Sequence, residues 1–488
     1  MKYLSAILLS FAIFAVSCKK EKDVWQGSTY ETLSVTEAPF PMKDIQVPVF
    51  PNREFPITNY GAISLPIDGS GFPTSLDSAR VIRVNAKAFE NAMEDCCNSN
   101  GGHVVVPKGE WLTGAIKFQS NCDLYLSEGS VLVFSGKPDD YVLDENGSWE
   151  GIECFNYCPL ILARQCSNIA ISGTGVLKPI MTEWVKWYEP TPDFQKALQI
   201  LDRWGSYGEK FFLRQISGYK YRLRPQLILF YKCNDILLQD FKVRESPHWA
   251  IHFFGCDQGI VRRLDVSAHG RRCDGIALEM SHSFVIEDCI FEQGGDAVSI
   301  KSGRVFETWN FPESSHDIMI RRCEAKRCKA FLSVGEEISH GVHNIYMYDC
   351  KASGEVDDLL SIRSNRRQGS EVFGITVERC EAGVLQRILG IDTDVYGDWR
   401  NSSSAIKDSL CATIKSVNVH NVKCHRTVAI VDINGDERKP IKDIIVKNVH
   451  VDSITSFVDH AINVKDCVVS DIDYNWLGRS DKLPVRPR

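Results

Sequence analysis

The sequence predicts an all-β fold, a single-stranded right-handed parallel β-helix, from a short repeat and the alternation within it. The phrase CDGIALE at residues 273–279 returns twenty-two residues later as GDAVSIK at residues 295–301. Apolar and polar side chains alternate in both copies, which is typical of β-strands. A unit this short that repeats in register indicates successive rungs of a solenoid, and right-handed crossovers are the general preference.

The same strand pattern recurs along most of the chain, with short apolar runs between turns rich in Gly, Asn and Asp. Rung starts are predicted near Ile169, Ile236, Ile260, Phe284, Ile318, Ile345, Ile375, Val417 and Ile444. Residues 84–96 carry apolar side chains at helical spacing and end before Gly101 and Gly102. We therefore expect a short N-terminal helix that covers the open edge of the first rung, in one β-helix domain over residues 55–475 with a tail at 476–488.

The N-terminus predicts a targeting segment rather than part of the fold. An apolar run after Lys2 ends in Ala15-Val16-Ser17-Cys18, which resembles the lipobox of bacterial lipoproteins. By that resemblance residues 1–17 are a signal peptide, Cys18 is lipidated, and residues 18–54 are tether and linker. We expect an exported lipoprotein of a Gram-negative-type bacterium, held at the periplasmic or cell-surface face of the outer membrane by its acyl chains alone.

Composition narrows the possible partners and ligands. With 24% charged residues and a net charge of −7, the chain lacks the basic surface expected of a nucleic-acid-binding protein. Cys289, Cys323, Cys350 and Cys380 end the same short phrase in four copies, so most of the eighteen cysteines are interpreted as buried core side chains. No zinc-type ligand pattern accompanies the CxxxC at residues 154–158, so we expect neither metal nor cofactor. We also expect a monomer.

The register of the predicted strands also brings the candidate site residues together. Asp274, Asp296, Ala330 and Asp358 fall in one outward column, and the next column holds Glu279, Lys301, Gly335 and Arg363. Neighbouring rungs lie about 4.8 Å apart, so the carboxylates would stack on a rigid face. Paired carboxylates suit acid–base chemistry on a sugar acetal. The structural alternatives are Asp residues that bond their own turns and a cross-strand ion pair between Glu279 and Lys301.

Several phrases, in the right order, resemble glycoside hydrolase family 28, the polygalacturonases, across roughly residues 55–470. They are YGA (60–62), GGHVVVPKG (101–109), WLTG (111–114), RPQLI (224–228) and SPHW (246–249). The resemblance implies a right-handed parallel β-helix that hydrolyses α-linked galacturonans or rhamnogalacturonans with inversion. It also implies a pectin-like acidic polysaccharide or oligosaccharide as the partner.

The catalytic signature of that family is only partly kept. Its Asn-Thr-Asp-Gly appears as RCDG (272–275), so Asp274 survives, and its Gly-Asp-Asp appears as GGD (294–296), with Gly295 in place of the usual general acid. Its His-Gly falls at Lys329-Ala330, and its Arg-Ile-Lys at SIR (361–363).

The function expected from these residues is hydrolysis of an acidic polysaccharide. Asp274 and Asp296 would position and activate the attacking water, and a relocated acid would protonate the leaving oxygen. Asp358 is the first candidate for that acid, because two rungs separate it from Asp296 by about 10 Å, and Glu336 is the second. The cations Lys301, Lys329 and Arg363 would bind an anionic sugar. The alternatives are a uronan β-elimination lyase and a non-catalytic polysaccharide-binding β-helix.

Overall fold

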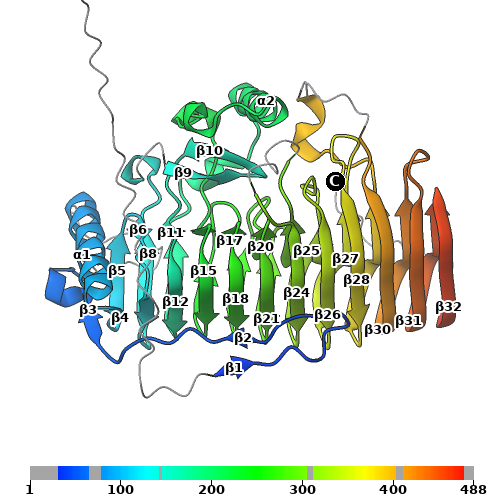
Figure 1. The fold of residues 1–488 in the computed structure, drawn as a ribbon, viewed down its shortest axis with the longest axis horizontal. Helices are drawn as coiled ribbons and strands as arrows, with labels where there is room; N and C mark the ends of the chain where they lie inside the picture. Colours follow the sequence, from blue (N-terminus) through cyan, green and yellow to red (C-terminus); the bar gives the residue numbers. More distant parts are fainter. Residues whose placement is uncertain (1–30, 65–77, 142–144, 305–310, 403–409, 477–488) are drawn as a thin grey trace, which may run out of the picture.

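The computed structural model describes residues 31–64, 78–141, 145–304, 311–402 and 410–476. It confirms the predicted architecture: 28 strands form one continuous sheet that winds into a right-handed parallel β-helix (Figure 1). Three parallel ladders run along its length, and each full turn of the chain passes through all three. The β-helix extends from Glu54 to Trp476.

The ladders are defined by their strand pairings. Ladder 1 contains β3 (Glu54–Pro56), β4 (Gly102–Val106), β7 (Cys122–Leu126), β12 (Ser167–Gly173), β15 (Asn234–Gln239), β18 (Asp257–Arg262), β21 (His282–Glu287), β24 (Ser315–Arg321), β26 (Val342–Tyr348) and β28 (Glu371–Glu378). Ladder 2 contains β5 (Gly109–Thr113), β8 (Ser130–Phe134), β13 (Val176–Pro179), β16 (Lys242–Arg244), β19 (Asp265–Ala268) and β22 (Ile290–Gln293). Ladder 3 contains β6 (Ile116–Lys117), β11 (Ile161–Arg164), β14 (Ile228–Tyr231), β17 (Ile251–Phe254), β20 (Ile276–Glu279) and β23 (Val298–Lys301).

The later strands are longer because they continue around corners. Ladders 2 and 3 share β25 (Glu324–Val334), β27 (Lys351–Arg363) and β29 (Glu381–Asp392). The last rungs are β30 (Thr413–Asn434), β31 (Ile441–Ile462) and β32 (Val464–Trp476).

The core is a set of stacked inward columns. Ile276, Val298, Leu332 and Leu360 share one register position on successive rungs, and all four are fully buried. The cysteines of the repeated phrase form a similar buried column, and every described cysteine is a free thiol. This agrees with the interpretation that those positions belong to the core, where a thiol packs as a small apolar group.

The expected N-terminal helix is present and is longer than the periodicity indicated. Helix α1 (Ser78–Asn98) packs its apolar face against β4, β5 and β6. After it the backbone takes positive φ at Asn100 and Gly101, and the N–H of Gly101 donates to the carbonyl of Cys96 (2.8 Å). The helix therefore covers the first rungs, preceded by the short η1 (Ile57–Tyr60).

Part of the predicted linker is packed against the body. Residues 31–50, which include β1 (Thr32–Leu33) and β2 (Ile45–Gln46), run along the outer face of ladder 1 (Figure 1). Val35, Ile45 and Val47 are buried there against outward apolar side chains of ladder 1. A tether over the whole of 18–54 thus does not describe this segment.

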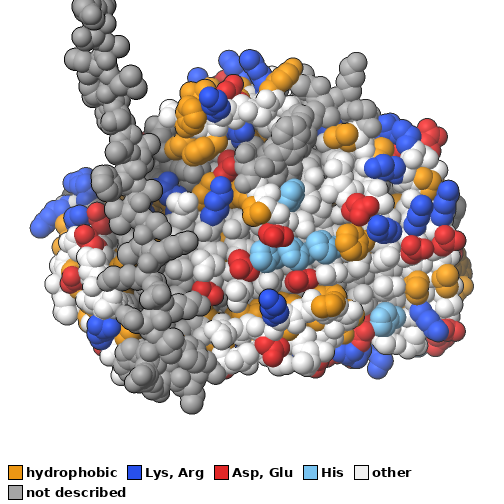
Figure 2. Space-filling model, viewed as in Figure 1, with side chains coloured by type: hydrophobic (Ala, Val, Ile, Leu, Met, Phe, Trp, Pro, Cys, Tyr) orange, Lys and Arg blue, Asp and Glu red, His pale blue; other side chains and the backbone are white. Residues whose placement is uncertain are grey.

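The outer face of ladder 1 also carries a stack of imidazoles. The rings of His282, His316 and His343 follow one another on successive rungs with centroids 4.8 Å apart. Figure 2 shows them as a pale blue stripe. They lie on a different face from ladder 3, where the predicted site residues gather.

Two insertions and one loop rise above ladder 3. The antiparallel hairpin β9 (Glu145–Trp149) and β10 (Ile152–Asn156) interrupts the chain between ladders 2 and 3, one turn before a longer insertion does the same. That insertion contains η3 (Trp184–Trp187), α2 (Pro192–Tyr207), η4 (Phe211–Leu213) and η5 (Tyr219–Tyr221). On the other edge of ladder 3, η7 (Gly397–Asn401) lies between β29 and β30. A further short helix, η2 (Pro138–Asp140), follows β8 of ladder 2. No described helix is both long and apolar enough to cross a bilayer.

Candidate active site

Five of the six residues predicted as catalytic or substrate-binding converge on one cavity of about 210 Å³ on the outer face of ladder 3. They are Asp274, Asp296, Lys301, Lys329 and Arg363; Asp358 does not line it. The remaining lining residues are Glu150, Trp249, Arg271, Arg272, Gly295, Glu336, Glu337, Gly397 and Asp398.

A larger hollow of about 360 Å³ lies on the last rungs, between His420, Ile445 and Asp471. Its ion pair between Lys447 and Asp471 (3.5 Å) is exposed on both sides. Buried, convergent charges of the kind that perform chemistry are found instead in the cavity of ladder 3.

Each aspartate of the pair holds the rung that follows it. Oδ1 of Asp274 accepts a hydrogen bond from the backbone N–H of Asp296 (3.0 Å), and its Oδ2 accepts one from the hydroxyl of Ser299 (2.9 Å). One rung later, Asp296 repeats the arrangement with the N–H of Ala330 (3.1 Å) and the hydroxyl of Ser333 (2.8 Å). The two carboxylates are therefore fixed in orientation on neighbouring rungs.

The two carboxylates differ in how readily they take up a proton. Burial raises the pKa of Asp274, and the charge of Asp296 raises it further. Burial acts in the same direction on Asp296, but Arg363, which donates to its Oδ2, and Lys301 hold the pKa of Asp296 below its ordinary value. Asp296 is thus the carboxylate that stays ionised, and opposite shifts in adjacent carboxyls are typical of sites where one serves as base.

The three predicted cations are placed at the cavity but differ in their partners. Nζ of Lys301 donates to the carbonyl of Gly335 (3.0 Å) and to Glu337 (3.0 Å), and it lies 4.0 Å from Oδ2 of Asp274. Arg363 is bound to Asp296. Lys329 is exposed, and within the described ranges its ammonium has no protein partner. Lys329 is therefore the cation most available to an anionic ligand.

Gly295 leaves no room for a side chain. A Cβ at this position would lie 2.2 Å from Oδ1 of Asp274 and 2.9 Å from the backbone nitrogen of the same residue. The Asp274 carboxylate fills the space beside Gly295. The packing of the site therefore excludes a side chain at residue 295, and with it the family's usual acid.

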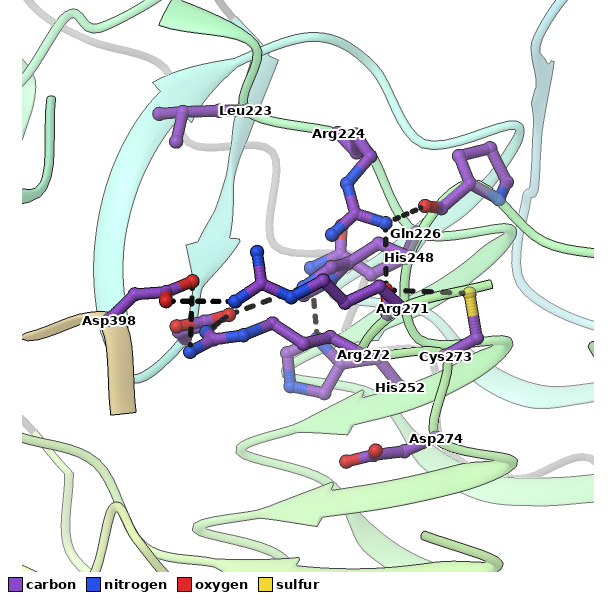
Figure 3. A network of polar contacts seen from close by, with 12 residues as sticks. Leu223, Arg224, Gln226, His248, His252, Arg271, Arg272, Cys273, Asp274 and Asp398 are labelled. Carbon is purple, nitrogen blue, oxygen red and sulfur yellow. Dashed lines mark hydrogen bonds and ion pairs between the residues drawn. The ribbon is translucent and has the colours of Figure 1, made fainter. Parts of the chain in front are cut away.

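Arg272 joins three segments that lie far apart in the sequence; Figure 3 shows it beside Arg271 and Asp398. Its guanidinium binds Glu150, in the turn of the β9–β10 hairpin, and Asp398 of η7 (3.3 Å). Arg271 binds the same Asp398 (2.9 Å), and the indole N–H of Trp399 donates to Glu150 (2.8 Å). We name this contact between η7 and the hairpin the arch. Arg272 precedes β20 and η7 follows β29, and these two strands are four rung-to-rung steps apart, about 19 Å.

Behind the arch lies a buried histidine. His248 stacks between Trp149 (5.5 Å between centroids) and Trp249 (5.0 Å), and its Nε2 lies 3.4 Å from Glu150. Burial lowers the pKa of His248 to about 4. Burial would raise the pKa of Glu150, but Arg272 and His248 hold it well below its ordinary value. The carboxylate that anchors the arch is therefore ionised.

Two adjacent glutamates lie at the far edge of the cavity. Glu337 pairs with Lys301 and with Arg304 (2.6 Å), and these cations outweigh burial and hold its pKa below the ordinary value. Glu336 has the opposite shift: burial, followed by the charge of Glu337, raises its pKa. The pair thus contains one ionised carboxylate and one that favours its proton.

Asp358, the first candidate for the acid, lies outside the cavity in an ion pair. Its two oxygens accept hydrogen bonds from Nε (2.8 Å) and Nη2 (2.6 Å) of Arg387. Arg387 occupies the same register position on the next rung and also contacts Asp432 (3.3 Å). The expectation that Asp358 faces the substrate is not supported by this geometry, because its carboxylate is turned to a neighbouring rung.

The expected ion pair between Glu279 and Lys301 does not form. Glu279 is fully buried and accepts instead from Nε2 of His252 (3.0 Å). Tyr396 and Trp399, in and beside η7, are buried and present no open ring face to a sugar, and Trp309 lies outside the described residues. Cys18 also lies outside them. Within the described ranges, no group of His, Cys, Asp and Glu has the arrangement of a metal site.

Residues that sequence reasoning missed as parts of the site are Glu150, Arg271, Arg272, Glu337 and Asp398. The replacement of the family's Asn by Arg272 was the one local signal. Glu150 and Asp398 come from loops more than 120 residues away from Arg272 along the chain, and no periodic pattern points to them.

Comparison with known proteins points to one family. Residues 206–470 match the sequence model of the family described as Glycosyl hydrolases family 28. The chain is 24% identical over 410 residues to an endo-polygalacturonase of Pectobacterium parmentieri, covering 80% of this chain and 91% of that protein. It is 22% identical over 378 residues to a probable polygalacturonase of Vitis vinifera, covering 75% and 71%.

Solved structures share the fold. A hyperthermoactive exopolygalacturonase from Thermotoga maritima superposes with a TM-score of 0.75 at 26% identity, covering 88% of this chain and 94% of that one. The family 28 exopolygalacturonase of Yersinia enterocolitica superposes with a TM-score of 0.63 at 18% identity, covering 90% and 78%.

Proposed function

The chain belongs to glycosyl hydrolases family 28, and from that premise we propose that it hydrolyses α-glycosidic bonds of a pectin-like, galacturonan-type polysaccharide or its oligosaccharides. Polygalacturonases among its relatives and structural neighbours support this substrate class. The observation that most directly supports the proposal is the stacked pair Asp274 and Asp296, in a cavity that is also lined by Lys301, Lys329 and Arg363. Carboxylates supply acid–base chemistry, and cations at the same place bind a uronate.

In this proposal the reaction proceeds with inversion. Asp296, held as carboxylate by Arg363, takes the proton of a water molecule that Asp274 helps to orient. The water attacks the anomeric carbon from the face opposite the leaving oxygen. Lys329 binds the sugar carboxylate, because its ammonium is the least engaged of the three cations.

We further propose that the enzyme acts on chain ends. A polysaccharide bound in an open groove would run along the axis of the β-helix, over ladder 3. The arch crosses this path, since Asp398 of η7 meets Arg272 and the side chain of Trp399 meets the hairpin at Glu150. A site roofed in this way accepts an end more readily than the middle of a chain, and two exopolygalacturonases are among the structural neighbours.

The direct test is release of reducing ends from a panel of polygalacturonate, rhamnogalacturonan and their oligosaccharides, with wild type and Asp296→Asn compared. We expect monomeric product from wild type at early times, the β-anomer as the first product by NMR, and loss of activity in the variant. A product that absorbs in the ultraviolet as an unsaturated uronate would instead identify a lyase. An α-anomer would contradict inversion.

A second candidate function is a non-catalytic polysaccharide-binding protein. Gly295 favours it, because the position of the family's acid is empty of any side chain and closed to one. Binding of oligogalacturonates by calorimetry, with no bond cleavage by wild type on any member of the panel, would support this candidate and contradict hydrolysis.

We propose that Cys18 carries a lipid anchor and that the body is monomeric and faces the aqueous side of an outer membrane. The lipobox-like Ala15-Val16-Ser17-Cys18 supports the anchor. Mass spectrometry of the mature N-terminus after expression in a lipoprotein-processing host would test it. An unmodified N-terminus, or a Cys18→Ala variant that fractionates with membranes like wild type, would contradict it.

A further inference from the structure

Among the described residues that line the cavity, one carboxylate has no protein partner. Five others are held by donors: Asp274, Asp296, Glu150, Glu337 and Asp398. Glu336 lines the same cavity, and in the part of the chain that the structure describes its carboxylate has no hydrogen bond or ion pair. A carboxyl group that is not locked by donors is free to exchange a proton with a ligand.

Glu336 lies across ladder 3 from the aspartate pair. Asp274 and Asp296 come just before β20 and β23, where the chain enters ladder 3, whereas Glu336 follows β25, where the chain leaves it. Both sides line the same cavity. A sugar bound over ladder 3 would therefore have the aspartates on one side and Glu336 on the other, the arrangement of acid and base that inversion requires.

The arch encloses the Glu336 side. A Cβ at Gly397 of η7 would lie 3.4 Å from both oxygens of Glu336, so the backbone of η7 backs the carboxyl group. Burial and the charge of Glu337 raise the pKa of Glu336, and Arg363, Arg272 and Arg304 oppose this shift without cancelling it. Glu336 can thus hold a proton at a pH at which Asp296 is ionised.

We infer that Glu336 is the general acid of the proposed hydrolysis, in place of the side chain that Gly295 lacks; this assignment rests on the proposed function. The carboxyl of Glu336 gives its proton to the glycosidic oxygen as the bond from that oxygen to the anomeric carbon breaks. The water oxygen bonds to the anomeric carbon from the other face, and its proton passes to Asp296. One water is consumed, two sugar ends are released, and the proton returns from Asp296 to Glu336 through solvent.

The other candidates for the acid are less suited. Both oxygens of Asp274 accept hydrogen bonds, from the backbone of Asp296 and from Ser299. Asp358 is bound by two nitrogens of Arg387 outside the cavity. Neither is as open to a leaving oxygen as Glu336.

The test uses leaving groups of different basicity. Wild type, Glu336→Gln, Glu336→Asp and Asp274→Asn are compared on an oligogalacturonate and on 4-nitrophenyl α-galacturonide. A sugar leaving group needs protonation and a nitrophenolate does not. We expect Glu336→Gln to lose about 10²–10⁴-fold in kcat on the oligogalacturonate, to lose less than about tenfold on the aryl substrate, and to lose the fall in activity at high pH. Glu336→Asp should keep part of the oligogalacturonate activity, because it keeps a carboxyl group.

Each other outcome overturns the assignment. Equal losses on both substrates would make Glu336 a positioning residue, and unchanged kinetics would give it no role. If Asp274→Asn, and not Glu336→Gln, lost activity on the oligogalacturonate and kept it on the aryl substrate, Asp274 would be the acid. A wild type that is inactive on the oligogalacturonate panel and on the aryl substrate would contradict the proposed function and this assignment with it, and is distinguished from the other outcomes by the wild-type measurement alone.

Discussion

The carboxylate of Asp274 lies directly against the backbone of Gly295, so that the two residues share a space that holds only one side chain. A Cβ at Gly295 would come within 2.2 Å of Oδ1 of Asp274. The same Oδ1 accepts the backbone N–H of Asp296. The glycine thus allows Asp274 to hold its neighbour, and the stacked carboxylates depend on the absence of a side chain between them.

We predict that Gly295→Ala lowers activity at least tenfold and the free energy of unfolding by about 1–3 kcal/mol, because overpacking displaces Asp274. Chemical denaturation and kcat/KM check this. Gly383→Ala is the matched control, since its nearest contact would be an ordinary 3.5 Å. A Gly295→Ala variant with the stability and activity of Gly383→Ala would refute the shared space.

Asp358→Asn is expected to reduce stability more than catalysis. Asp358 is 5% exposed, and loss of its charge leaves Asp432 as the acidic partner of Arg387 among the described residues. Breaking a buried pair costs about 3–5 kcal/mol; the partial exposure of Arg387 reduces this to about 1–3 kcal/mol. Thermal unfolding measures it. Asp349→Asn, in the exposed pair with Arg379, should cost less than about 1 kcal/mol. A selective loss of kcat in Asp358→Asn would restore its role as the acid.

Stability should fall as the pH decreases from 6.5 to about 4, in part through His248. Its folded pKa is lowered by burial to about 4, so the unfolded chain binds the proton first and acid favours unfolding. The lowered pKa of His248 corresponds to about 3 kcal/mol of stability, which is present above pH 6.5 and lost toward pH 4. Urea midpoints across this range, for wild type and His248→Gln, measure the effect. A variant with the same pH slope as wild type would exclude His248 as its source.

Opening the arch should change the products. Asp398→Asn weakens the contacts to Arg271 and Arg272, and we expect oligomers to appear beside monomer in the early products of polygalacturonate digestion. Chromatography of the first products and solution viscosity report this. Asp394→Asn, in an exposed pair with Arg400, is the control. Monomer as the sole early product in both variants would argue that the arch does not enforce chain-end action.

The fold followed from the sequence because its signal is local and repeated. The alternation at residues 273–279 and 295–301 fixes which side chains point inward, and the register of Asp274, Asp296, Lys301 and Arg363 follows from it by simple alignment. The same alignment, extended by one rung, places Arg387 beside Asp358 and would have indicated an ion pair there.

The rest of the site has no periodic signal. Glu150 and Asp398 reach Arg272 from a hairpin and a loop whose positions depend on tertiary packing. The packed segment 31–50 was likewise interpreted as linker, because Pro and Thr residues obscure its few apolar contacts. Solenoid rungs are readable from sequence, whereas contacts between their loops are not.

The arch also has a consequence in time. During synthesis both aspartates of the pair leave the ribosome more than 100 residues before Asp398 does. Early rungs can stack on α1 as they emerge, since each contacts mainly its neighbours. The roof over the cavity closes only when η7 arrives, so a nascent chain, or one truncated before η7, has a wound body and an unfinished site. Competence for catalysis is in this sense acquired later than the rungs that carry the aspartates.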